Sequence, residues 1–256
     1  MNLSEKVVLV TGGLSGIGAS CVVEFPKNGI KGVVVADISS GEEIIQNFNA
    51  KYGEGGVTFV KADVFLINRG WSIMTCTSNI YWKRVLMYVY SASNDCLTPN
   101  NDASSNKGDN ENAFQKTVDT YNSIDILISA AGIADENDWQ RLIQVNLIGP
   151  SIGCNLAINT YFPKYKTGAS AYIINISSIA GIIPYKDAPH YAATKHGLIG
   201  LTRSYGQNKV IIEQDVFVMA LCPGRTDTPM ENPTFLSKTL YGDQLLEDLF
   251  AVPSQK

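Results

Sequence analysis

The chain has 256 residues, 45% hydrophobic and 17% charged, which suits a globular protein long enough for one large α/β domain. Its formal net charge is -4, so it has no basic surplus to meet the phosphates of nucleic acid or of an anionic membrane. The five cysteines are dispersed and there are only two histidines, which argues against a metal site and for reduced thiols in the cytoplasm. No signal peptide is expected, because the N-terminus runs straight into a strand-like segment, and no membrane span is expected, because no apolar run reaches about 18 residues.

Apolar, β-branched runs alternate with helical stretches along the chain. Strands are predicted at 6–13, 32–37, 56–64, 124–132, 169–178 and 215–224, and helices at about 16–27, 40–53, 111–121, 137–165 and 189–208. This alternation predicts parallel βαβ units and therefore an α/β fold, a single Rossmann-like domain with a doubly wound sheet of order 3-2-1-4-5-6.

The interval between the third and fourth predicted strands is longer than a crossover helix needs. We therefore expect an insertion at about 65–110 within a single domain that spans residues 1–256. The stretch 91–112 is mostly Asn, Ser and Asp and is predicted to be disordered or a surface loop.

A glycine-rich turn, "TGGLSGIG" at 11–18, lies between the first strand and the first helix. Gly12 permits a tight turn, Gly16 lets a pyrophosphate approach the helix N-terminus, and Gly18 lets helix and strand pack closely. The alternative is a glycine-rich loop that binds nothing.

Asp37 ends the second predicted strand, about twenty residues after the last of these glycines. An acid at this place accepts hydrogen bonds from the adenosine ribose hydroxyls and repels the 2′-phosphate of NADP. No Arg or Lys occurs in 12–18, so NAD is the predicted cofactor. The alternative is that Asp37 caps a helix.

Several short motifs occur together in the order typical of one family. They are the TGxxxGxG turn, Asp63–Val64, "AAG" at 130–132, Asn146, Ser178, the YxxxK pair Tyr191 and Lys195, and "PG" at 223–224 followed by Thr226 and Thr228. In this combination, over about 6–64 and 111–230, the chain resembles the short-chain dehydrogenases/reductases. Within that family, "DWQRLIQVNLIG" and "YAATKHGLIGLTRS" resemble NAD-dependent 15-hydroxyprostaglandin dehydrogenases, and the opening resembles insect-type alcohol dehydrogenases.

The Tyr191–Lys195 pair is suited to proton transfer. Removing a hydride from an alcohol carbon requires removal of the hydroxyl proton, and an ordinary tyrosine, with a pKa of about 10, is too weak a base at neutral pH. Lys195 lies one helical turn on, so its ammonium and the positive nicotinamide are expected to lower the pKa of Tyr191. Tyr191 is then the general base in oxidation and the general acid in reduction. In isolation, the same residues would be a surface pair.

The resemblance assigns the remaining site residues. Ser178, rather than its neighbour Ser177, would hold the substrate oxygen, and Asn146 would anchor a water relay to Lys195. Without the other motifs, Asn146 could simply be an Asn in a helix with a satisfied amide, and Thr226 and Thr228 could be surface threonines in a Pro/Gly turn. The residues expected to contact NAD are Gly12, Ser15, Gly16, Ile17, Gly18, Asp37, Asp63, Val64, Ala131, Gly132, Tyr191, Lys195, Pro223, Gly224, Thr226 and Thr228.

The resemblance implies an NAD-dependent alcohol dehydrogenase that acts on a secondary or lipid-like alcohol, a cytoplasmic location, and a homodimer or homotetramer. A catalytically idle NAD-binding or interaction protein is the alternative, and an NADPH carbonyl reductase is disfavoured by Asp37. Ser129 and Ala130 replace two asparagines that the family usually has, which puts a structural hydrogen bond in doubt. The insertion has no family counterpart, and the family's last helix and seventh strand are not found. An unspliced insertion with an early stop would explain both.

Overall fold

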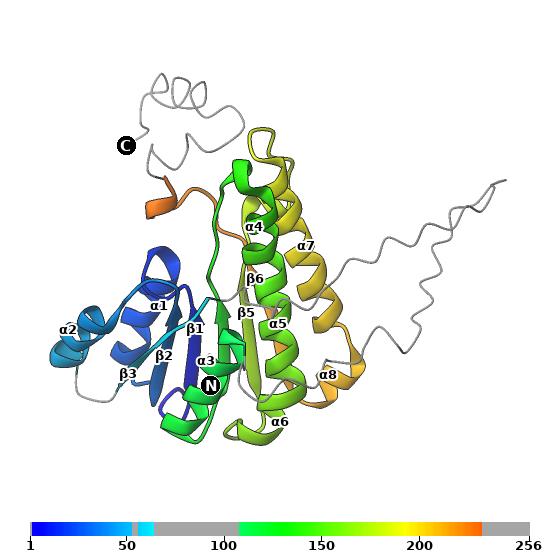
Figure 1. Cartoon of the computed structure of the whole chain (residues 1–256). Helices are drawn as coiled ribbons and strands as arrows, with labels where there is room; N and C mark the ends of the chain where they lie inside the picture. Colours follow the sequence, from blue (N-terminus) through cyan, green and yellow to red (C-terminus); the bar gives the residue numbers. More distant parts are fainter. Residues whose placement is uncertain (1, 53–55, 64–107, 232–256) are drawn as a thin grey trace, which may run out of the picture.

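The computed structural model describes residues 2–52, 56–63 and 108–231 (Figure 1). These residues form one six-stranded sheet in the order β3-β2-β1-β4-β5-β6, which confirms the predicted doubly wound α/β fold. The strands are β1 (Val7–Thr11), β2 (Gly32–Asp37), β3 (Val57–Lys61), β4 (Ile126–Ser129), β5 (Ala171–Ile176) and β6 (Val216–Leu221). All pairings are parallel, so the carboxyl ends of the strands meet at one edge of the sheet.

Helices cover both faces of the sheet (Figure 1). They are α1 (Gly16–Lys27), α2 (Glu42–Tyr52), α3 (Asp109–Tyr121), α4 (Trp139–Ile143), α5 (Gly149–Leu156), α6 (Phe162–Tyr165), α7 (Pro189–Gly206) and α8 (Lys209–Glu213). Because helices cover both faces of the sheet, every residue of β1 and β2 is buried, and this explains why their sequences are almost continuously apolar.

Two hydrophobic clusters hold these layers together. On one face, Leu9 and Leu127 of the sheet pack with Phe114 of α3 and Phe162 of α6. On the other face, strand residues such as Val10 belong to a cluster with side chains of α1 and α2. Over β6 this second face is open in the described part of the chain, where alternate side chains are about half exposed: Phe217, Met219 and Leu221.

The predicted long helix at 137–165 is not one regular helix. A 3-10 turn, η2 (Glu136–Asp138), precedes α4, and π-helical segments at Gln144–Ile148 and Ala157–Tyr161 interrupt it. Pro150 and Pro163 follow these segments, and a proline ring clashes with the carbonyl four residues earlier in an α-helix. The wider π turns accommodate both prolines without ending the helix.

The prediction that all of 91–112 is loop was wrong at its end. Residues from Asp109 onward form the first turn of α3, and Asn110 is buried. The Asp109 carboxylate accepts the N–H of Asp63 at 2.9 Å, so this turn is fastened to the residues after β3. The rest of the predicted insertion lies outside the described residues. None of the described helices is long and apolar enough to cross a membrane.

Candidate active site

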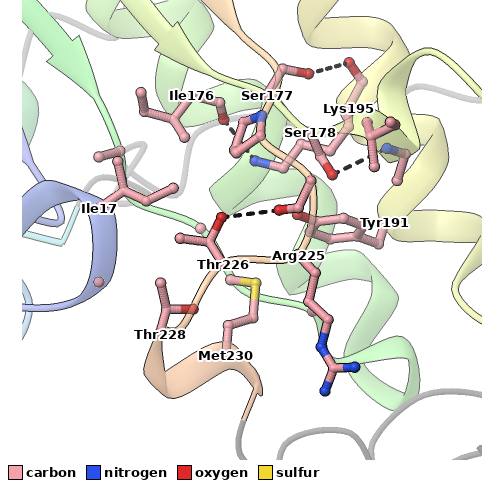
Figure 2. Close-up of a pocket in the computed structure, with 18 of the residues that line it drawn as sticks. Ile17, Ile176, Ser177, Ser178, Tyr191, Lys195, Arg225, Thr226, Thr228 and Met230 are labelled. Carbon is pink, nitrogen blue, oxygen red and sulfur yellow. Dashed lines mark hydrogen bonds between the residues drawn. The ribbon is translucent and has the colours of Figure 1, made fainter. Parts of the chain in front are cut away.

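A pocket of about 530 Å³ opens at the carboxyl edge of the sheet (Figure 2). Its walls come from the segments that follow β1, β4, β5 and β6 and from the start of α7. The parallel topology therefore brings residues from distant parts of the chain to one place, where ligands bind in open α/β sheets.

The first and last glycines of the turn are required by close packing. Gly12 has a φ of +67°, a conformation that favours glycine, and a Cβ there would lie 2.6 Å from the Cα of Ala131. A Cβ at Gly18 would lie 2.2 Å from the carbonyl oxygen of Gly12. The turn thus brings β1, the start of α1 and the predicted cofactor residue Ala131 into direct contact.

The N-terminus of α1 faces the pocket. Ser15, Gly16 and Ile17 all line it, and Gly16 has a φ of +52°. Ser15 makes no capping hydrogen bond, and the first turn of α1 holds no acidic residue. The helix dipole is therefore available to an anion. Thr228 approaches from the segment after β6, with side-chain carbons 3.4 Å from where a Gly16 Cβ would lie.

Asp37 fastens the glycine turn from the neighbouring strand. One carboxylate oxygen accepts the N–H of Leu14 and the other the N–H of Ser39, each at 3.0 Å. It therefore does not cap α2, which begins at Glu42. Each oxygen keeps acceptor capacity for a further donor.

The two serines after β5 have different partners. Ser177 is buried and its hydroxyl donates to the carbonyl of Lys195 at 3.0 Å. The Ser178 hydroxyl accepts the N–H of Ala180 at 3.1 Å, and it lies close enough to Tyr191 to act against the rise of that residue's pKa. Figure 2 shows Ser178 between Lys195 and Tyr191 on the wall of the pocket. The structure therefore brings Ser178, and not Ser177, to the tyrosine.

Tyr191 does not have the lowered pKa that the sequence predicted. Burial raises its pKa, the hydrogen bond from Ser178 opposes that rise, and Tyr185 adds to it. Lys195 lies over the ring, with its ammonium 5.4 Å from the ring centroid. Desolvation of the phenolate therefore outweighs the lysine in the protein without cofactor.

Lys195 is itself buried at the floor of the pocket. Its ammonium donates to the carbonyl of Ile176 at 2.9 Å. Burial lowers the pKa of Lys195 to about 8, and Cys222 opposes this shift. A lysine held in this way can change its charge near neutral pH.

Asn146 is completely buried, and its amide is satisfied by main-chain groups. The side-chain oxygen accepts the N–H of Ile133 at 2.9 Å, and the nitrogen donates to the carbonyl of Ile133 at 2.7 Å. A longer contact of 3.4 Å reaches Thr194 on α7. The side chain thus clamps the loop after Gly132, and the interpretation as a satisfied amide holds for it.

The segment after β6 forms the outer wall. The predicted cofactor residues Pro223, Gly224, Thr226 and Thr228 all line the pocket, as does Gly132 on the opposite side. The Thr226 hydroxyl donates to the carbonyl of Gly224 at 3.0 Å, which closes a local turn.

Some predicted site residues do not line the pocket, and several lining residues were missed. Val64 lies outside the described residues, and the other predicted residues that do not line the pocket are Gly12, Gly18, Asp37, Asp63, Ala131 and Asn146. Sequence reasoning missed Tyr185, Arg225 and Met230, because none of them is a residue that the motifs specify. Their only signal was their position next to motif residues.

Both histidines have hydrogen-bond partners within the protein. His196 contacts the carbonyl of Ala192 at 2.9 Å, and His190 contacts Glu136 at 2.7 Å. Within the described ranges, no group of His, Cys, Asp and Glu could hold a metal ion.

The sequence model of the short chain dehydrogenase family matches residues 6–69 and 65–238. The chain therefore belongs to this family of oxidoreductases, as the motifs predicted.

Named relatives within the family share part of the chain. The mouse 15-hydroxyprostaglandin dehydrogenase [NAD(+)] is 38% identical over 117 residues, which are 46% of this chain and 43% of the mouse enzyme. The chain thus aligns with less than half the length of that relative. The Macaca fascicularis enzyme of the same name is 28% identical over 89% of this chain and 71% of its own. Trans-4-hydroxycyclohexanecarboxylate dehydrogenase of Sinomonas cyclohexanicum is 28% identical over 89% of this chain and 75% of its own.

Solved structures share the fold. A short-chain dehydrogenase/reductase from Burkholderia phymatum, solved in complex with NAD, superposes with a TM-score of 0.71 at 18% identity, covering 100% of this chain and 82% of its own. One from Brucella melitensis gives 0.62 at 22% identity, covering 90% and 76%.

Proposed function

We propose that the protein is an NAD-dependent oxidoreductase that oxidises a secondary alcohol to a carbonyl compound, with Tyr191 as the proton acceptor. One observation carries this proposal. Ser178 and Tyr191 line the same pocket as the N-terminus of α1, so a reactive hydroxyl site and an anion site face one cavity.

Each residue at the reactive end has a role that follows from its contacts. The Ser178 hydroxyl would hold the substrate oxygen, and Tyr191 would take its proton during oxidation and return it during reduction. Lys195 would supply positive charge beneath the ring, which favours the phenolate once a substrate is bound. Asn146 would hold the loop at Ile133 in place through its side-chain amide. It would also anchor a water relay to Lys195.

NAD fits the other end of the pocket. The open N-terminus of α1 would bind the pyrophosphate, and the Asp37 carboxylate would accept hydrogen bonds from the ribose hydroxyls. When bound, NAD supplies the acceptor for the hydride. The names of the prostaglandin dehydrogenases include NAD(+), and the Burkholderia protein was solved in complex with NAD, which supports the same cofactor here. The remaining proposed contacts are Gly12, Ser15, Ile17, Gly18, Asp63, Val64, Ala131, Gly132, Pro223, Gly224, Thr226 and Thr228.

The charges of the pocket favour a substrate that carries an anionic group. Lys195 and Arg225 line it, and none of the described lining residues is acidic. In Figure 2 the side chain of Arg225 extends away from Ser178. A hydroxy acid could therefore place its hydroxyl at Tyr191 and its carboxylate near Arg225. The name of the Sinomonas relative describes such a substrate.

The test is a turnover assay with the full-length protein. NAD+ or NADP+ is offered with cyclohexanol, trans-4-hydroxycyclohexanecarboxylate, a hydroxysteroid and a 15-hydroxyprostaglandin, and NAD(P)H formation is followed by absorbance. The proposal predicts turnover with NAD+, fastest with an alcohol that carries a carboxylate. Binding of NAD+ without turnover of any alcohol would instead support the catalytically idle binding protein.

A further inference from the structure

The helix that carries Tyr191 starts without a cap of its own. Its first residue is Pro189, which has no N–H, and the preceding Ala188 has no side chain that could accept a hydrogen bond. The next main-chain donors, on His190 and Tyr191, have no acceptor within the helix. In a buried place these donors need an acceptor from elsewhere.

Glu136 supplies that acceptor from a remote part of the chain. One carboxylate oxygen accepts the N–H of Tyr191 at 2.8 Å, and the other accepts the N–H of His190 at 3.2 Å. The Glu136 side chain is 0% exposed, so water does not compete for these bonds. Its negative charge lies at the positive end of the α7 dipole, where a carboxylate is stabilised.

His190 and Trp139 cover the carboxylate from the solvent side. The His190 ring nitrogen Nδ1 is 2.7 Å from the oxygen that also accepts the His190 N–H. The same ring stacks on Trp139, with centroids 5.5 Å apart and planes at 19°. The Glu136 side chain is thus held by contacts on both oxygens and cannot move away without breaking several of them.

The carboxylate connects the pocket wall to the tyrosine. Glu136 begins η2, only a few residues after the lining residues Gly132 and Ala134. The carbonyl of Tyr191 is bonded locally, to the Thr194 hydroxyl at 2.7 Å, so the N–H is the tie to another element. Moving Glu136 would therefore move the main chain of Tyr191 relative to the opposite wall.

We propose that Glu136 is a positioning residue, which fixes the main chain of Tyr191 and thereby holds the phenol beside Ser178. It does not touch the reacting atoms. The effect on turnover rests on the proposed function, whereas the placement of Tyr191 does not, and the two are tested separately.

The first test uses the protein without cofactor or substrate. Glu136→Gln keeps the length of the side chain but leaves one acceptor oxygen, so one main-chain N–H loses its partner. We expect amide hydrogen exchange at His190 or Tyr191, followed by NMR, to become at least about tenfold faster. The titration of the Tyr191 phenol is obtained by subtracting the ultraviolet pH titration of Tyr191→Phe. The phenol should titrate at higher pH, because Ser178, which acts to lower the pKa of Tyr191, is no longer held beside it. Glu24→Gln, an exposed carboxylate paired with Lys27 at 2.7 Å, is the matched control and should change neither.

The second test measures turnover with the best alcohol from the panel. When kcat is calculated per NAD-binding site, Glu136→Gln should lower it by about 10- to 100-fold, as expected for a misplaced catalytic group. The NAD dissociation constant should stay unchanged. The solvent isotope effect on kcat should rise, because proton transfer becomes slower. A purely structural role would lower the folded fraction and leave both the isotope effect and kcat per site unchanged.

Unchanged amide exchange and an unchanged phenol titration in Glu136→Gln would overturn the proposal, whatever the turnover. If no alcohol is turned over, the proposed function fails while the first test still decides the role of Glu136. If Glu136→Gln does not fold, Glu136→Asp carries the same tests. Its shorter side chain keeps the charge but cannot reach both N–H groups, and it should shift the same measurements in the same direction.

Discussion

Replacing Lys195 with methionine should separate stability from activity. Methionine keeps the unbranched stem but removes the buried charge, and with it the donor to the Ile176 carbonyl. Burial lowers the pKa of Lys195 from 10.5 to about 8, a difference that corresponds to about 3 kcal/mol of destabilisation of the folded state at neutral pH. The lost hydrogen bond to a charged donor costs about 1.5–3 kcal/mol in the opposite direction. At pH 7 the two effects nearly cancel, so the variant should fold about as stably as the parent.

The pH dependence is where the two proteins should differ. Between about pH 8 and 10.5 the lysine of the unfolded chain stays protonated while that of the folded chain has lost its proton. The unfolded state then binds more protons, so the stability of the parent protein rises with pH, by at most about 1.4 kcal/mol per pH unit. Lys195→Met lacks this group, so in this window its stability should fall progressively behind that of the parent protein as the pH rises.

Urea unfolding of both proteins without NAD, at several values from pH 7 to pH 10, measures the difference. Other titrating groups are shared and cancel in the comparison. Parallel stability curves would show that Lys195 is not destabilised by burial, and the account of the pocket floor would be refuted. The variant should also lose turnover at every pH.

Other substitutions test the cofactor and substrate ends of the pocket. Gly18→Ala should destabilise by about 1–3 kcal/mol and weaken NAD binding, because its Cβ would lie 2.2 Å from the Gly12 carbonyl. Gly200→Ala, whose Cβ would have no neighbouring atom within 4 Å, is the control in a helix and should not destabilise the protein. Urea unfolding and NAD titration measure the stability and the NAD affinity of both variants. Asp37→Ala combined with Ile38→Arg should reverse the preference for NAD over NADP in kcat/KM and also lower NAD affinity, because the Leu14 N–H loses its acceptor. Arg225→Gln should raise the KM for trans-4-hydroxycyclohexanecarboxylate by about tenfold and leave that for cyclohexanol unchanged; equal effects on both would remove Arg225 from carboxylate recognition.

The sheet could be predicted from the sequence because its strands are buried on both faces. Val7–Thr11 and Gly32–Asp37 are continuous apolar runs for that reason, and their alternation with helices determines the parallel order. The π turns before Pro150 and Pro163 were missed, although the prolines were visible. A periodic pattern shows that a helix continues but does not show how it widens around a proline.

The motifs predicted many of the residues that line the pocket, among them Ser178, Tyr191 and Lys195, but not how these residues are bonded. Ser178 was distinguished from Ser177 only by resemblance, whereas the reason is that Ser177 donates to the carbonyl of Lys195. Glu136 was missed because its partners lie more than fifty residues away and no local pattern marks it. The signal that could have found it was negative: Ala188 and Pro189 start a helix without a capping side chain.

The measurement that tests the central claim most directly is the turnover of Tyr191→Phe. The substitution removes one oxygen and keeps the ring, so packing and NAD affinity should be retained. Loss of a positioned acid–base group should lower kcat by at least about 10²–10⁴-fold, with the alcohol that the parent enzyme turns over fastest as substrate. Near-normal turnover with an unchanged pH profile would contradict the assignment of Tyr191 as the group that exchanges a proton with the substrate.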